Sequence, residues 1–327
     1  MTHRRRRWPW ILGLLLFGLC AVVALGWESD RTVEALKPHW AQAPSEFIDL
    51  QGMRVHLRDQ GPRSDSVPLV LLHGTSASLH TWEPWVAALE AQRRVVSVDL
   101  PGFGLTGPDP QRDYRIERYV DFVHALMEER QIQRAVLVGN SLGGWIAWEF
   151  ALAHPEQTDR LVLVDPAGYG TMPQEIPIGF RLARHEWTRP LLEHLLPRSL
   201  VRGSVEQVYG DPSLVSEDLV DRYFELSLRE GNRGALFDRF SQGLGSPANR
   251  ERTAQISCPT LILWGEQDRL IPPADGHKFA EDIPSSQLVV LPGLGHVPHE
   301  EAPTASLAAV TAFLQSAVES TTQSSPP

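Results

Sequence analysis

A serine placed between glycines is the first feature of this sequence that could do chemistry. Ser141 lies in the segment Gly-Asn-Ser-Leu-Gly-Gly at 139–144, which follows an apolar run at 135–138 and precedes a helix-like run at 145–153. In a sharp turn between a strand and a helix, a serine is held in a strained conformation with its hydroxyl exposed. This context predicts a serine nucleophile for acyl transfer, provided that an acid and a histidine follow it in the chain.

Candidates for the acid and the histidine come later, each just after a predicted strand. Asp268 follows the apolar run 259–265, and His296 lies in a glycine-flanked segment after the run 288–291. The chain order Ser141, Asp268, His296 is that of a serine hydrolase whose nucleophile comes first. In such a triad the histidine takes the serine proton and the acid fixes the histidine tautomer. We therefore predict these three residues as catalytic.

Other acids and histidines compete for the two roles. Asp165 also ends a predicted strand after the serine and stays open as an alternative acid. Glu266 is nearer to its strand than the role requires, and Asp99 precedes the serine and is interpreted as a buried loop anchor. His73 is interpreted as bracing its own loop, and His299, beside two glutamates, as part of a solvated turn.

Acyl transfer also requires donors for the negative charge of the tetrahedral intermediate. Two backbone N–H groups beside the nucleophile commonly supply this oxyanion hole. One is predicted to be the N–H of Leu142, at the start of a helix whose dipole favours negative charge. The other is expected from the loop after the strand at 68–72, where Thr75 is the candidate.

Holding these residues in place requires a sheet. Continuous apolar runs at 68–72, 95–99, 135–138, 161–165, 259–265 and 288–291 predict strands buried on both faces. Alternation over 47–59 predicts an opening hairpin, and helices are expected at 116–130 and 303–318.

The strand pattern stops between 169 and about 250. Amphipathic stretches at 180–196 and 217–230 predict helices instead. Helices inserted between parallel strands would cover the strand ends, where open α/β sheets bind ligands. The aromatic residues of this segment are expected to form its core or an apolar ceiling over the site: Tyr169, Phe180, Trp187, Tyr209, Tyr223, Phe224, Phe237 and Phe240.

The motifs taken together resemble the α/β-hydrolase fold superfamily. The resemblance rests on His73-Gly74, on the segment 99–104 and on the segment 139–144, and it covers residues 46 to about 318. It implies an α/β fold with a mostly parallel eight-stranded sheet, helices on both faces and an inserted helical cap. The chemistry implied is a serine hydrolase acting through an acyl-enzyme, which calls for neither a metal nor an organic cofactor.

Two features of the sequence argue against particular activities found in this superfamily. Serine at 141 argues against the dehalogenases and epoxide hydrolases, whose chains need a carboxylate nucleophile. The loop 73–77, His-Gly-Thr-Ser-Ala, lacks the H-G-G-P-G of proline iminopeptidases and the H-G-x-G-P-G of C–C bond hydrolases. The main hypothesis is therefore an esterase or lipase-like hydrolysis of small or medium apolar acyl esters. A C–C bond hydrolase, a perhydrolase or an acyltransferase with the same triad, and a membrane-tethered binding protein, are alternatives.

Composition limits the partners of the protein. The 327 residues are 42% hydrophobic, enough to bury one large α/β domain or two ordinary ones. The net charge is −10, although four of the 30 basic side chains are Arg4 to Arg7, ahead of any folded part. This acidic balance argues against nucleic acid as a partner. The two cysteines, Cys20 and Cys258, form no readable disulfide framework or metal site.

The N-terminal sequence predicts where the protein lies with respect to the membrane. Residues 8–27 carry no charge and follow four arginines, and they are long enough to cross a hydrocarbon core of about 30 Å as a helix. Because arginines stay cytoplasmic, we expect a membrane-anchored protein with an extracytoplasmic catalytic domain, or a secreted one after signal cleavage. The expected organisation is a basic tail and transmembrane anchor at 1–27, a tether at 28–45, hydrolase core at 46–168 and 251–319, a cap at 169–250 and a disordered tail at 320–327.

Overall fold

An eight-stranded sheet forms the centre of the protein. The structure, a computed structural model, describes residue 8 and residues 26–171, 175–243 and 245–322. The strand order is β1-β2-β4-β3-β5-β6-β7-β8; β2 is antiparallel to β1 and β4, and the other neighbours are parallel. The predicted mostly parallel sheet of eight strands is confirmed. The strands are β1 (Glu46–Leu50), β2 (Met53–Gln60), β3 (Leu69–Leu72), β4 (Val95–Val98), β5 (Ala135–Asn140), β6 (Thr158–Val164), β7 (Thr260–Gly265) and β8 (Ser286–Leu291).

Both faces of the sheet are covered, which explains why its central strands read as continuous apolar runs. Successive strand residues point to opposite faces. Val70 and Leu72 of β3 pack in the core shared with α4, α5 and α12, whereas Leu69 and Leu71 pack in the core shared with α3 and α14. The core helices and turns are α3 (Glu83–Leu89), α4 (Ile116–Glu129), α5 (Leu142–Ala153), α11 (Asn249–Thr253), α12 (Pro273–Asp282), α13 (Pro298–Glu301), α14 (Pro303–Thr322), η1 (Leu79–Trp82) and η2 (Pro155–Gln157).

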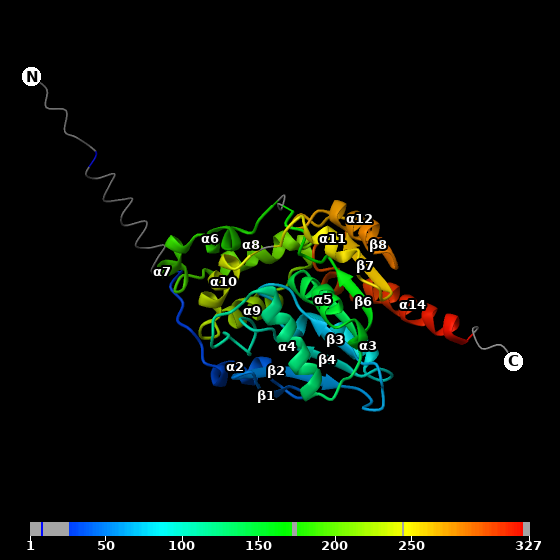
Figure 1. Ribbon diagram of the computed structural model, residues 1–327. Coiled ribbons are helices and arrows are strands. Elements are labelled where there is room, and N and C mark those ends of the chain that lie inside the picture. The colour runs from blue at the N-terminus through cyan, green and yellow to red at the C-terminus, as the bar shows by residue number, and fades with distance from the viewer. Residues whose placement is uncertain (1–7, 9–25, 172–174, 244, 323–327) are drawn as a thin grey trace, which may run out of the picture.

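A helical insertion separates β6 from β7, and we call residues 169–250 the cap. Figure 1 shows α6, α7, α8 and α10 gathered on one side of the molecule, away from the β1–β2 hairpin. The cap elements are α6 (Ile178–Ala183), η3 (Glu186–Thr188), α7 (Arg189–Leu192), α8 (Arg198–Val208), η4 (Pro212–Leu214), α9 (Glu217–Ser227) and α10 (Asn232–Ser241).

One expected cap helix is broken. The amphipathic pattern at 180–196 predicted a continuous helix, but the chain forms α6, η3 and α7 instead. Pro190 lies in the first turn of the third piece, α7, where a missing N–H costs nothing, and Thr188, the last residue of η3, donates its hydroxyl to Leu182 O near the end of α6 at 2.8 Å. The prediction failed because the interior proline was given too little weight.

The expected membrane placement is corrected by the structure. Among the described residues, no helix combines the length and the apolar character needed to cross a bilayer. The extracytoplasmic, membrane-anchored placement is therefore not supported. The longest described helix, α14, carries serine, threonine and glutamine along its 20 residues. The predicted anchor at 8–27 falls mostly on residues 9–25, which lie outside the described residues.

The described segment after residue 25 packs on the cap. Trp27 stacks on His194 with ring centroids 4.8 Å apart, and Glu28 N donates to His194 O at 2.8 Å. Arg31 pairs with Glu225 of α9 at 2.7 Å. The stretch 28–45, expected to be a tether, also contains helix α2 (Val33–Trp40).

Gly104 is a position where the fold requires a glycine. Its φ is +52°, and a Cβ there would collide with the carboxyl group of Asp99. We expect Gly104→Ala to lower the free energy of unfolding by about 2–4 kcal/mol, from backbone strain and overpacking. Urea denaturation measures this loss. Gly203→Ala is the matched control: nothing lies within 4 Å of its Cβ position in α8, so the substitution should be neutral or stabilising. Equal stabilities of the two variants would contradict this account of the loop.

Candidate active site

The segment around Ser141 forms a sharp turn between β5 and α5. Ser141 has φ 53° and ψ −113°, a strained conformation for a residue with a side chain. A Cβ at position 139 would collide with Gly143 O, and one at 143 with Leu72 O, so the turn closes only with glycine at both positions. The first N–H groups of α5 point toward the space beside the serine, as expected at a helix N-terminus. The turn therefore has the geometry predicted for a nucleophile.

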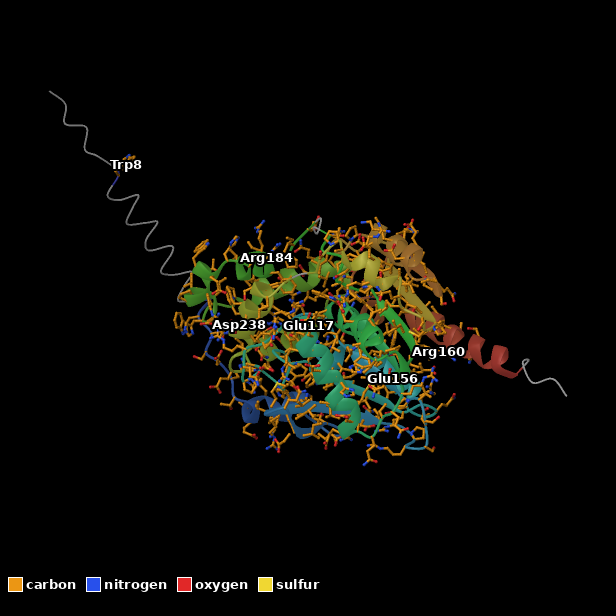
Figure 2. All side chains as sticks on the ribbon, viewed as in Figure 1. Trp8, Glu117, Glu156, Arg160, Arg184 and Asp238 are labelled. Carbon is orange, nitrogen blue, oxygen red and sulfur yellow. The ribbon has the colours of Figure 1, made fainter. Side chains whose placement is uncertain are left out.

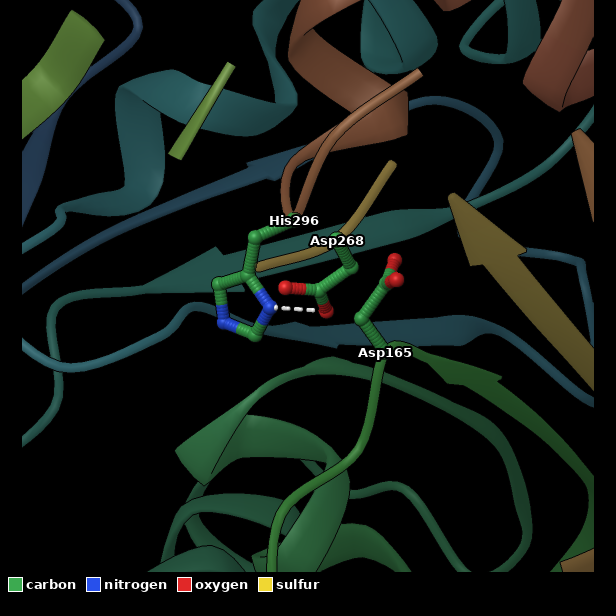
Figure 3. A group of neighbouring side chains, drawn as sticks. All are labelled: Asp165, Asp268 and His296. Carbon is green, nitrogen blue, oxygen red and sulfur yellow. Dashed lines mark hydrogen bonds and ion pairs between the residues drawn. The ribbon is translucent and has the colours of Figure 1, made fainter. Parts of the chain in front are cut away.

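Asp268 and His296 are neighbours in the structure, although they are 28 residues apart in the chain. His296 Nδ1 lies 2.6 Å from Asp268 Oδ2, and both side chains are buried (Figure 3). The other carboxylate oxygen of Asp268 accepts the N–H groups of Leu270 at 2.8 Å and Ile271 at 2.9 Å. These two donors orient the carboxylate, so that Oδ2 faces the imidazole and holds the proton on Nδ1.

Ser141 and His296 line one cavity of about 410 Å³. The hydrogen bond between them, which we expected from the sequence, is not formed: among the described residues His296 Nε2 has no partner. Free enzymes commonly show such bonds long or misaligned before substrate binds. The unengaged Nε2 faces the cavity side, where a general base would take a proton from Ser141.

The two predicted oxyanion donors border the same cavity. Thr75 and Leu142 both line it beside Ser141. Neither N–H donates a hydrogen bond to any part of the chain that the structure describes. Free backbone donors next to a nucleophile are what a developing oxyanion needs.

Asp165 lies beside this pair, although it does not take the place of Asp268. Its Oδ1 accepts Gly265 N at 2.9 Å, and no described group bonds its Oδ2. Burial, together with the charge of Asp268, raises the pKa of Asp165 well above its ordinary value. Ligand atoms of Asp165, Asp268 and His296 lie within 4.8 Å of one another, as in Figure 3. His296 Nδ1, the atom that a metal would need, is already engaged by Asp268.

The two residues interpreted as loop supports do hold loops. Asp99 accepts Leu79 N and Leu105 N, each at 2.7 Å, and faces His56 Nδ1 at 2.7 Å. The His73 ring spans its own loop and the next: Nδ1 lies 2.7 Å from Gly74 O, and Nε2 accepts Leu100 N. Together these bonds fix the loop that carries Thr75.

A buried histidine next to Asp99 makes stability depend on pH. Burial lowers the pKa of His80 to about 4, despite the opposing effect of Asp99, while the unfolded value is about 6.5. Between these values the unfolded chain binds a proton that the folded chain does not, so the free energy of unfolding falls as the pH falls from 6.5 to 4.

The variant His80→Gln tests this pH dependence. Its loss of stability over that window should be smaller than that of the natural protein by about 1 kcal/mol per pH unit. Denaturant unfolding at pH 7, 5.5 and 4.5 measures both proteins. Arg58, Glu83 and Arg222 also act on the titration of His80 and stay unchanged in the comparison. Parallel stability curves would show that His80 does not carry the effect.

Several supporting residues were not found from the sequence. Asn140 donates its amide to His296 O at 3.0 Å and to Val164 O at 3.1 Å, which ties the histidine loop to the serine turn. Glu301 accepts Gly295 N at 2.8 Å and Gly210 N at 3.0 Å, which ties the same loop to the cap. Only its position beside the nucleophile could have signalled Asn140.

His299 corrects another expectation. It was interpreted as part of a solvated turn, but it is fully buried and its Nε2 lies 3.0 Å from Thr81 Oγ1. Its ring packs against Trp82 with centroids 4.2 Å apart. Burial, with the neighbouring His296, lowers the pKa of His299 well below its ordinary value. The two glutamates beside it misled the interpretation, because α13 presents them and the imidazole to different surroundings.

The aromatic residues of the cap divide into three groups. Five of them line the cavity: Tyr169, Phe180, Tyr223, Phe237 and Phe240. Tyr209 and Phe224 belong to the cap core, and Trp187 is 80% exposed. The cap ceiling is therefore partly aromatic, as expected, and it is completed by leucines of α7 and α8.

These features define a class of protein: an α/β sheet that carries a serine turn and a His–Asp pair at the carboxyl ends of its strands, beneath inserted helices. Comparison with known families agrees. The model of the alpha/beta hydrolase fold family matches residues 67–303, and the chain belongs to this family. It is a hydrolase-fold protein, as the motifs at 73, 99 and 141 indicated.

Three known proteins show what this chain is similar to. A 2-hydroxy-6-oxononadienedioate/2-hydroxy-6-oxononatrienedioate hydrolase of Comamonas testosteroni is 30% identical over 258 residues, covering 76% of this chain and 86% of its own. A solved meta-cleavage product hydrolase from Pseudomonas fluorescens is 25% identical, with a TM-score of 0.71, covering 83% of this chain and 98% of that chain. A membrane phospholipase A, 23% identical with a TM-score of 0.71 over 94% of this chain and 98% of that chain, shares the fold.

Proposed function

We propose that the protein hydrolyses a carbonyl substrate through an acyl-enzyme formed on Ser141. The observation that carries this proposal is the 2.6 Å hydrogen bond between His296 and Asp268 in the wall of the cavity that holds Ser141. His296 Nε2 would take the proton of the serine hydroxyl, and Asp268 would stabilise the imidazolium. The N–H groups of Thr75 and Leu142 would hold the oxyanion.

For the bond that is cleaved, we propose a carbon–carbon bond next to a ketone. The relatives are named for hydrolysing 2-hydroxy-6-oxo acids, which offer a ketone but no ester. Ser141 would attack the ketone carbon, and the bond to the neighbouring carbon would break. The 2-hydroxydiene must first tautomerise to its 2-oxo form, with C5 protonated, so that the electron pair of the broken bond leaves as a conjugated dienolate, which takes the proton from His296. Water, deprotonated by His296, then hydrolyses the acyl-enzyme and releases a carboxylic acid.

Ester hydrolysis is the second candidate, and one observation favours it. The cavity is lined by several leucines that suit an alkyl chain: Leu192, Leu195, Leu196 and Leu200. The loop 73–77 also departs from the C–C hydrolase pattern H-G-x-G-P-G. An ester would pass through the same acyl-enzyme, with an alcohol in place of the enolate as the leaving group.

One assay panel separates the two candidates. The protein is assayed with 2-hydroxy-6-oxo-6-phenylhexa-2,4-dienoate, whose cleavage is measured by the loss of its absorbance and the formation of benzoate. It is also assayed with a series of p-nitrophenyl esters of increasing chain length. The proposal predicts a kcat/KM for the dienoate above that for any ester. A dienoate that is left intact while esters are hydrolysed would establish the second candidate. Ser141→Ala protein is the blank in both assays.

A further inference from the structure

Among the described residues, the cavity holds one buried cation whose charge is not balanced. Three arginines line it: Arg184, Arg233 and Arg239. Arg184 is exposed at the edge of the cap (Figure 2). Arg233 is buried but pairs with Asp30 at 2.6 Å. Arg239 of α10 is only 5% exposed and forms no ion pair within the described residues.

The contacts of Arg239 leave most of its donors unused. Nη1 donates to Gly243 O, while Nε, buried, has no partner in the described part of the chain. The guanidinium carbon lies 5.4 Å from the Trp145 ring. Burial lowers the pKa of Arg239, as expected for a charged group removed from water. A buried charge without a partner is expensive, so such an arginine calls for an anion.

Its neighbour places this arginine at the reaction site. Trp145 lies in the first turn of α5, and its backbone N–H donates to the backbone oxygen of Ser141, the N-cap residue, at 3.0 Å. Both residues line the cavity together with Arg239. A cation of the cap and the core residues that would perform the chemistry therefore line the same cavity.

We propose that Arg239 binds a carboxylate group of the substrate. This inference deepens the proposed function and rests on it, because it assigns the substrate as an acyl compound that bears a carboxylate away from the cleaved bond. The guanidinium fork matches a carboxylate geometrically and binds it most strongly where water is excluded. Arg222 of α9 does not compete for this role, since Glu300 pairs with it and it does not line the cavity.

A pair of probes of equal length isolates the carboxylate. Mono-p-nitrophenyl glutarate carries an anionic end, and p-nitrophenyl valerate has the same number of carbons without it. In Arg239→Met, kcat/KM for the anionic ester should fall about 30-fold, as expected for a hydrogen bond to a charged group, while the neutral ester changes less than about threefold. Arg239→Lys should retain part of the preference. Arg181→Met removes an exposed cap arginine that does not line the cavity and should change neither rate.

Binding provides a second measurement that needs neither turnover nor a variant. Titration calorimetry on the natural protein compares valerate with valeramide, and we expect the carboxylate to bind at least about tenfold more tightly. Equal affinities, or an equal fall of both esters in folded Arg239→Met protein, would overturn the proposal. If the C–C hydrolase proposal is wrong, the dienoate stays intact in its own assay. The ester comparison and the calorimetry still test whether Arg239 binds a carboxylate.

Discussion

Replacing Ser141 by alanine is expected to lower kcat by about 10⁴-fold or more, whichever carbonyl substrate is used. The turn at 139–143 would keep its shape, because alanine tolerates the strained backbone no worse than serine does, but no hydroxyl would remain to form the acyl-enzyme. The measurement is hydrolysis of a p-nitrophenyl ester, together with labelling by a fluorophosphonate probe.

Labelling gives this prediction its control. Ser204 also lines the cavity, but its hydroxyl donates to Leu200 O at 2.8 Å within α8. Ser204→Ala should therefore be labelled like the natural protein, while Ser141→Ala should not be labelled at all. Labelled, active Ser141→Ala protein would remove the nucleophile from our account, and a folded natural protein that is not labelled would favour a binding protein instead.

The second large effect is expected from Asp268→Asn, which should lower kcat by about 10³–10⁴-fold. One oxygen of Asp268 accepts two backbone N–H groups and the other faces His296 Nδ1. An amide must keep its oxygen toward the two N–H donors, so its NH₂ group would face the imidazole. The histidine would then carry its proton on Nε2, the wrong tautomer for taking a proton from Ser141. A pH profile of kcat/KM for an ester measures the loss of the base.

Asp165→Asn is the matched variant. Burial and the charge of Asp268 raise the pKa of Asp165 and so favour its neutral form, and its Oδ1 accepts Gly265 N, as an amide oxygen can also do; an isosteric amide should therefore change kcat less than about tenfold. The same change from carboxyl to amide is thus expected to have a large effect on kcat at position 268 and a small one at position 165. If Asp165→Asn proved as damaging as Asp268→Asn, the acid of this site would have to be reassigned to the end of β6.

These variants also separate catalysis from stability. Asp268 and Asp165 are both buried, and an isosteric amide at either position preserves shape. Thermal unfolding of each variant shows whether a loss of activity comes with a loss of structure. We expect a comparable Tm for both, and therefore a difference that lies in the chemistry.

Much of the core was predictable because its signals are local. A strand buried on both faces needs apolar residues throughout, so β3, β4, β5, β6 and β7 appear directly as apolar runs. The turn at Ser141 was predictable from its local motif, in which Gly139 lies against Gly143, although Gly143 itself lies against Leu72 of the neighbouring strand β3. The order of acid and histidine after two later strands then followed from the chain alone.

What the sequence could not show depends on contacts between distant segments. Nothing next to Arg239 in the chain signals that it lies unpaired in the cavity, since its environment is made by α5 and the loop at 243. His299 is buried by η1, more than 200 residues earlier, and the pKa of Asp165 is raised by its burial and by the charge of Asp268. Local composition predicted the opposite environment for His299, and it predicted a membrane placement that no described helix supports.

The amino-acid sequence by itself therefore determined the sheet, the turn that carries Ser141 and the chain order of the three proposed catalytic residues, because backbone sterics and burial act over short stretches. Only the tertiary structure decided which acid faces His296, which cap residues line the cavity and which of its cations has no acidic partner in the described part of the chain. Charge compensation and desolvation are properties of a three-dimensional environment, and segments far apart in the chain create that environment together.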